Sequence, residues 1–120
     1  QNRNVRLLSM DLPEIATAVS TWAKGKPLVK RVYLFGSRVR GDHGAKSDID
    51  IAVELDPSAF PGSDESGGLA TWMFETEGWR GELEGLIPLE IQLERYHPEQ
   101  TPTIREGLAQ SSQLVYEKAT

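Results

Sequence analysis

The sequence predicts a small α/β or α+β fold in which a mixed β-sheet is flanked by helices. Two observations predict it: apolar residues recur at helical spacing in three segments, and short apolar or alternating runs typical of strands lie between them. The 120 residues are expected to form one domain, 1–120, around a single core. Residues 1–10 are polar and mixed, and we expect them to be loosely ordered or bound to a partner.

The first helix is expected over residues 12–24, because Asp11 suits the N-cap and Glu14 completes a capping-box pattern. A Lys-Gly-Lys-Pro run ends it. Residues 29–35 are expected to form a strand. Its apolar residues do not alternate with polar ones, so we predict a central strand with both faces covered.

A short helix is expected over residues 37–42, a loop over 43–47 and a second strand over 48–55. Asp48 and Asp50 are two residues apart, so on a strand they point to one face, about 6.6 Å apart. The opposite face carries the apolar side chains that can enter a core: Ile49, Ile51, Val53 and Leu55.

Residues 56–68 are rich in Pro, Gly, Ser and acidic residues and are expected to form a loop. A long helix is expected over 69–86, with a kink or break near Gly78 and Gly81. We expect Trp22, Trp72 and Trp79 to be core residues. The last expected elements are a strand over 89–96, a helix capped by Thr101 or Thr103, and a strand over 113–116.

The stretch from Gly36 to Asp50 carries the chemistry. Gly36 permits a sharp turn and a close approach of the backbone to a ligand. Ser37 can open a short helix whose amide groups face an anion. Two carboxylates on one strand face can share a divalent cation, so the stretch predicts a site for a metal-bound nucleoside triphosphate.

Gly36-Ser37, ten further residues and then Asp48-Ile49-Asp50 resemble the signature of nucleotidyltransferases related to DNA polymerase beta. The short chain resembles the minimal nucleotidyltransferases, which often act as the antitoxin of a pair with a HEPN-domain toxin. The resemblance implies a polymerase-beta-like fold, in which a middle strand carries the carboxylates. It also implies two Mg²⁺ ions and ATP or another nucleoside triphosphate as substrate.

By this resemblance, Asp48 and Asp50 hold the metals and are catalytic, together with a third carboxylate on a neighbouring strand. Glu90 is our preferred third carboxylate, and Gln92 is the alternative if the strand register is shifted by two. In the second case the site binds nucleotide but transfers poorly. The expected nucleotide-binding residues are Gly36, Ser37, Arg38, Arg40, Lys46 and Ser47.

The formal net charge of −5 argues against general attraction to nucleic acid. The absence of cysteine excludes disulfides and fits a cytoplasmic location. No apolar run approaches the ~18 residues of a membrane span. We therefore expect a HEPN-type protein partner rather than a nucleic acid or a membrane.

Two classes of function follow. The first is an enzyme that transfers a nucleoside monophosphate, AMP in our preferred reading, to a hydroxyl of a protein partner. The second is a non-catalytic antitoxin or nucleotide-binding module that acts by direct contact. A structural domain that carries the motif by chance is the plainest alternative.

Overall fold

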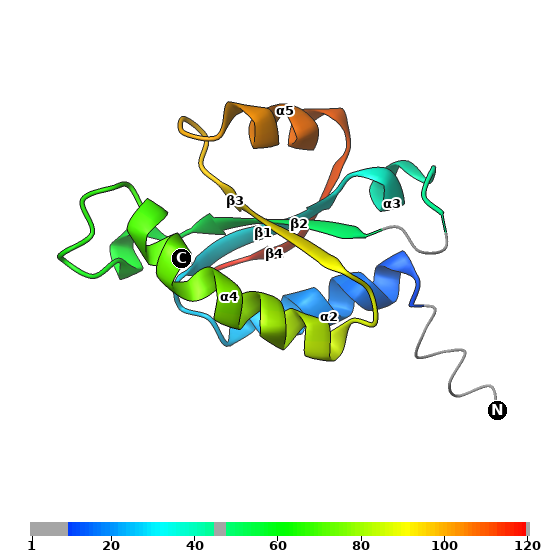
Figure 1. Ribbon diagram of the computed structural model, residues 1–120, viewed down its shortest axis with the longest axis horizontal. Helices are drawn as coiled ribbons and strands as arrows, with labels where there is room; N and C mark the ends of the chain where they lie inside the picture. The colour runs from blue at the N-terminus through cyan, green and yellow to red at the C-terminus, as the bar shows by residue number, and fades with distance from the viewer. Residues whose placement is uncertain (1–9, 45–47, 120) are drawn as a thin grey trace.

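The computed structural model describes residues 10–44 and 48–119 and confirms the predicted mixed α/β architecture (Figure 1). The elements follow in the order α2 (Leu12–Lys24), β1 (Val29–Phe35), α3 (Ser37–Arg40), β2 (Ile49–Leu55), the 3-10 helix η1 (Pro57–Ala59), α4 (Leu69–Leu86), β3 (Ile91–Tyr96), α5 (Pro102–Gln110) and β4 (Ser112–Glu117). The capping box at the start of α2 forms as predicted, with reciprocal bonds between Asp11 and Glu14.

The four strands form one sheet in the order β3-β2-β1-β4. β1 runs antiparallel to β2 and to β4, whereas β2 and β3 are parallel. The sheet is therefore mixed, and β1 and β2 are its central strands. Asp50 lies in β2 and Asp48 directly precedes it, so a middle strand carries the carboxylates, as the resemblance implies.

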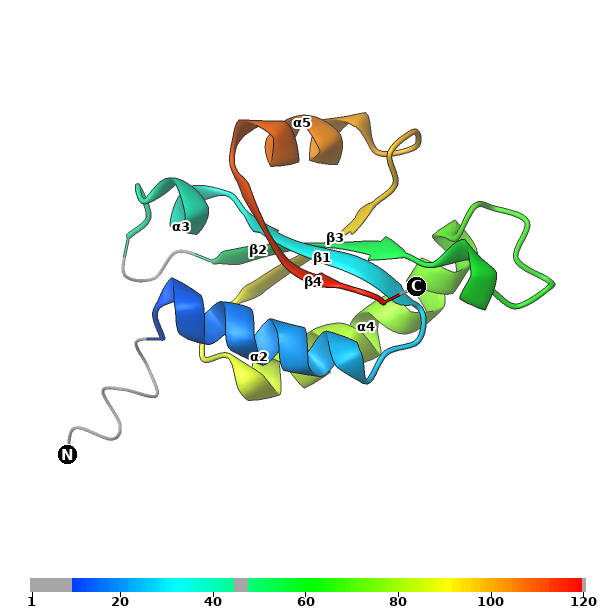
Figure 2. The same cartoon turned by 180° about the vertical axis from the view of Figure 1, so that it is seen from behind.

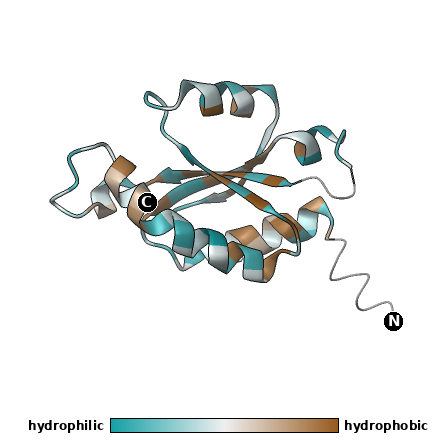
Figure 3. Ribbon diagram, viewed as in Figure 1, coloured by the Kyte–Doolittle hydropathy of each residue, from teal (hydrophilic) through white to brown (hydrophobic). Residues whose placement is uncertain are grey.

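Helices cover both faces of the sheet. In Figures 1 and 2 the sheet is seen nearly edge-on, with α2 and α4 on one side and α3 and α5 on the other. Val32 and Leu34 of β1 are fully buried on the α2 side, and Phe35 lies against Gly107 of α5 on the other. Figure 3 shows hydrophobic residues gathered on the strands and on α2. The prediction that β1 is covered on both faces is confirmed.

The three tryptophans belong to the core, as predicted. Trp79 packs edge-on against Trp22 and Trp72, with ring centroids 5.7 and 6.0 Å apart. The Trp22 indole Nε1 donates a hydrogen bond of 2.8 Å to Glu82, so its one polar atom is satisfied. This cluster fixes α2 and α4 to each other beneath the sheet.

The predicted kink in the long helix is wrong, because α4 continues unbroken from Leu69 to Leu86. A Cβ atom at Gly78 or Gly81 would meet nothing within 4 Å, so both glycines lie on the open side of the helix. Trp79 and Leu83 are buried on the other side and hold the helix straight against the sheet. Met73 has the spacing of a core residue but is 68% exposed.

Several boundaries differ from the predicted ones. β3 begins at Ile91 rather than at 89, because the chain bends where the Leu89 N–H donates to the Ile87 carbonyl (2.8 Å). α3 ends at Arg40, since Gly41 adopts a left-handed conformation with φ of 87°. The 56–68 loop contains η1, and β4 extends one residue beyond the predicted strand at each end. Among the described residues, no helix has both the length and the apolarity to cross a bilayer.

Candidate active site

Gly36 joins β1 to α3 with a backbone that other residues rarely adopt, φ 81° and ψ −158°. A Cβ atom at this position would collide with the Asp50 carboxylate. The N–H groups of Val39 and Arg40 both donate to the Gly36 carbonyl at 3.1 Å, which turns the chain into α3 at once. The missing side chain therefore lets the Gly36-Ser37 turn lie directly against the carboxylate of β2, as the motif predicts.

The two aspartates of the motif interact electrostatically. Burial raises the pKa of Asp50 above its usual value, and the negative charges of Asp48 and Glu94 raise it further. Arg40 acts in the opposite direction. Asp50 is thus a half-buried carboxylate among like charges. A cation placed between these groups would relieve that repulsion.

The third strand adds an amide to this pair. In the parallel register Gln92 lies opposite Asp50, and the Gln92 Nε2 donates a 3.0 Å hydrogen bond to Oδ2 of Asp48. Glu94 lies opposite Ala52 on the same face. The sequence did not reveal the Gln92–Asp48 bond or the influence of Glu94 on Asp50. Alternation along the strand placed these residues on one face, but only the register shows which β2 residue each one meets.

Glu90 lies just before β3 and is exposed. Its carbonyl accepts the Ile49 N–H at 3.0 Å, so its backbone joins β2 beside Asp48. Within residues 10–44 and 48–119, no three His, Cys, Asp or Glu side chains form a cluster that could hold a metal ion. Glu90 as the third carboxylate therefore stays a prediction, and Gln92 stays the alternative.

The predicted phosphate-binding residues are placed in part. Ser37 opens α3, and Arg38 follows it as a partly buried residue. The Arg40 Nε forms a 3.2 Å ion pair with Asp42. Lys46 and Ser47 lie outside the described residues. The structure thus brings Gly36, Asp48, Asp50 and the positive charge of Arg40 into one site.

The donor set fits magnesium that arrives with a nucleotide. Mg²⁺ prefers oxygen ligands and is usually held by one or two carboxylates together with substrate phosphates and water. Asp48 and Asp50 supply two carboxylates, and the remaining positions suit phosphate oxygens. An all-protein cage would need more ligands than the described residues bring together.

Comparison with known proteins places the chain in a family. The sequence profile of the family described as "Polymerase beta, Nucleotidyltransferase" matches residues 18–120. A curated protein of Methanocaldococcus jannaschii, named "Putative protein adenylyltransferase", is 40% identical over 55 residues, which cover 46% of this chain and 55% of that protein. The match thus spans about half the length of this relative.

Solved structures share the fold at low sequence identity. A chain from the crystal structure of a toxin–antitoxin with AMP-PNP has a TM-score of 0.55 at 19% identity and covers 86% of this chain and 73% of its own length. A chain from a complex of tri-AMPylated Shewanella oneidensis HEPN toxin with MNT antitoxin has a TM-score of 0.52 at 18% identity, with coverage of 87% and 71%. Because the family profile extends over most of the chain, the predicted resemblance is confirmed, and the chain belongs to the polymerase beta nucleotidyltransferase family.

Proposed function

We propose that this protein transfers AMP from magnesium-bound ATP to a hydroxyl group of a protein partner. The observation that carries the proposal is the packing of the Asp50 carboxylate against the Gly36-Ser37 turn, with Asp48 beside it. The turn would face the β- and γ-phosphates, and Asp48 and Asp50 would hold Mg²⁺, which would supply positive charge for the phosphates. The name of the curated relative, a protein adenylyltransferase, supports AMP as the transferred group.

The reaction forms one bond and breaks one. The acceptor oxygen attacks the α-phosphorus, the bond from that phosphorus to the oxygen bridging the β-phosphate breaks, and pyrophosphate leaves. The hydroxyl proton passes to a carboxylate of the site or to water. Bound Mg²⁺ supplies charge neutralisation for the attacking oxygen and the leaving group. The chain contributes the carboxylates that hold Mg²⁺ and a turn that positions the phosphates.

We further propose a HEPN-type toxin as the partner, with this chain as its antitoxin. The structure of the MNT antitoxin with an AMPylated HEPN toxin shares the fold and supports this choice. The net charge of −5 favours a basic protein over a nucleic acid.

Co-expression with a candidate HEPN-type protein, followed by intact mass measurement, tests the transfer. We expect the partner to gain the mass of one or more AMP groups. The double variant Asp48→Asn with Asp50→Asn is the matched control, since it removes two charges at nearly constant volume, and it should give no gain. A stable complex whose partner stays unmodified would reject the transfer.

A non-catalytic antitoxin is the second candidate, and one observation favours it. Gln92, an amide, lies opposite Asp50 and contacts Asp48 where a third carboxylate would otherwise fit. If Glu90 completes the site, Glu90→Gln abolishes transfer without unfolding the protein, while Gln92→Ala has little effect. If Gln92 occupies the place instead, Gln92→Asp raises the rate of transfer.

A further inference from the structure

β3 is an edge strand, and among the residues that the structure describes no strand pairs with its outer side. Figure 1 shows β3 as the strand nearest the viewer, with no other element in front of it. Ile49 pairs with Ile91, and the Ile49 N–H donates to the carbonyl of Glu90. In this parallel pattern, the N–H and C=O groups of Ile91 itself point away from β2. The same two-residue period directs the backbone groups of Leu93 and Arg95 outward.

A groove runs along this open edge. It has a volume of about 900 Å³, and its walls are residues 87–94 and the side chains of Arg80 and Glu84 from α4. Gln92 lines the groove and also bonds Asp48. Gln92 therefore links the groove to the carboxylate pair, although neither Asp48 nor Asp50 lines the groove itself. A molecule bound in it would lie beside the reacting centre.

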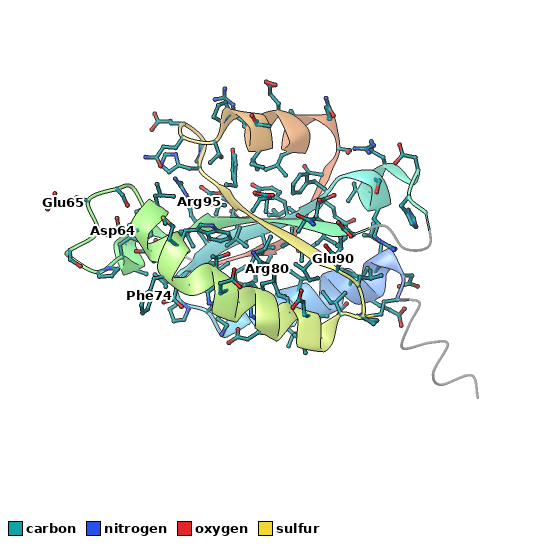
Figure 4. All side chains as sticks on the ribbon, in the orientation of Figure 1. Asp64, Glu65, Phe74, Arg80, Glu90 and Arg95 are labelled. Carbon is teal, nitrogen blue, oxygen red and sulfur yellow. The ribbon has the colours of Figure 1, made fainter. Side chains whose placement is uncertain are left out.

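The groove is acidic. Glu84, Glu90 and Glu94 line it, and within residues 10–44 and 48–119 none of the three forms an ion pair. Arg80 is the positively charged residue that lines the groove, but its guanidinium forms a 3.0 Å ion pair with the Glu77 carboxylate. Figure 4 shows Arg80 and Glu90 on the side of the molecule where β3 is exposed. The charge of the groove selects a basic occupant.

We propose that the outer edge of β3 binds the acceptor as an extended, basic peptide segment, which adds a fifth strand to the sheet and presents its hydroxyl beside Asp48 and Asp50. The inference rests on the proposed transfer and names the form in which the acceptor binds. Three outward residues offer main-chain donors and acceptors over about 16 Å, which suits a segment of about five residues. Main-chain pairing gives affinity, and the glutamates select lysine or arginine around the hydroxyl.

The test is a display selection on the full chain in the presence of Mg²⁺ and an α,β-methylene analogue of ATP, whose carbon bridge prevents AMP transfer during the selection. The library presents nine-residue segments with Tyr, Ser or Thr at the centre. We expect the enriched peptides to be rich in Lys or Arg, and we expect these basic residues to alternate with β-branched residues along the peptide. Each enriched peptide is then made with N-methyl groups on one set of alternate residues, and separately on the other set. Methylation of the set that pairs with β3 should weaken binding at least tenfold, and methylation of the opposite set should have little effect.

Two variants complement the peptides. Arg95→Pro and Leu93→Pro each remove one outward N–H without breaking the ladder to β2, and both should weaken peptide binding. If one of these variants fails to fold, the two N-methylated forms of each peptide still test the proposal on the wild-type protein. A selection that enriches no peptide, or equal binding by both methylated forms, would overturn the proposal.

The same samples separate this inference from the proposed function. Calorimetry with Mg²⁺ and ATP reports on the nucleotide site, and peptide mass reports on transfer. If the protein binds nucleotide but captures no peptide, only the proposal that the β3 edge binds the acceptor is rejected. Peptide capture with the alternating methylation effect but without any AMP gain supports the docking edge and rejects the transfer.

Discussion

Gly36 is the residue on which the geometry of the site most directly depends. Replacement by alanine forces a conformation that is nearly exclusive to glycine, at a cost of about 1–3 kcal/mol. It also drives a methyl group into the Asp50 carboxylate. We expect Gly36→Ala to weaken calorimetric binding of magnesium–ATP at least tenfold, because Asp50 must move.

Gly41 offers a matched control. It also has a positive φ, 87°, but a Cβ atom there meets nothing within 4 Å. Gly41→Ala should lose about 1 kcal/mol of stability from the backbone alone and keep its nucleotide affinity. Equal loss of nucleotide binding in both variants would show that general destabilisation, not the contact with Asp50, is responsible.

The raised pKa of Asp50 predicts a pH dependence of stability. Burial and the charge of Asp48 raise this pKa in the folded state above the unfolded value. The folded protein therefore holds the proton more tightly, and the contribution of Asp50 to stability falls as the pH rises through the folded pKa.

Asp50→Asn removes this contribution. Urea unfolding in EDTA should show that the free energy of unfolding of the variant, relative to wild type, increases from pH 4 to pH 7. Other carboxylates contribute stability that is lost as the pH falls. Asp56 is one of them, because Lys118 and Ser58 lower its pKa to about 2. These contributions are the same in the variant and the wild type, so the comparison at each pH cancels them. A difference between variant and wild type that is constant with pH would contradict the account of Asp50.

At the scale of the element, the two glycines in the middle of α4 lower its intrinsic helix propensity, and packing against the sheet compensates for this. Gly78 and Gly81 lie on its open side, and a methyl group at either position meets no other atom within 4 Å. Alanine removes the entropic cost of glycine, so Gly78→Ala and Gly81→Ala should each raise the free energy of unfolding by about 0.4–1 kcal/mol. Urea denaturation measures this. Destabilisation by either variant would mean that the helix bends at that glycine.

The sequence predicted most elements because their signals are local. The capping box at Asp11 and Glu14 and the apolar runs of β1 and β2 depend on near neighbours in the chain. The kink in α4 was predicted wrongly, because helix propensity does not include the packing of Trp79 between Trp22 and Trp72. The start of β3 was predicted two residues early, since the turn at Ile87 depends on the burial of that side chain.

The site was predictable where it follows from spacing within one motif. Gly36 lies close to Asp48 and Asp50, as expected. The Gly36-Ser37 turn directly follows β1, and β1 pairs antiparallel with β2, which places Phe35 opposite Asp50. The contribution of the third strand was not predictable, since the pairing of Asp50 with Gln92 is a long-range property of the sheet. The same limit explains why the sequence left Glu90 and Gln92 as alternatives.

At the scale of the whole molecule, the sheet order places the carboxylates between the Gly36-Ser37 turn on one side and the open β3 edge on the other. The nucleotide would be held from the side of the turn, and an acceptor can approach from the side of the edge. The two proposed substrates thus meet above β2. This arrangement depends on β3 lying at the edge of the sheet next to β2.

The central claim is that Asp48 and Asp50 bind a magnesium-bound nucleoside triphosphate. Calorimetric titration of the wild-type chain with ATP, in Mg²⁺ and again in EDTA, tests it most directly. Two carboxylates need phosphate oxygens to complete the coordination of Mg²⁺. We therefore predict that the wild type binds ATP in Mg²⁺ and binds it only weakly in EDTA. The double variant Asp48→Asn with Asp50→Asn should not bind ATP in either condition. Equal affinity of the wild type and the double variant for ATP in Mg²⁺ would contradict the account.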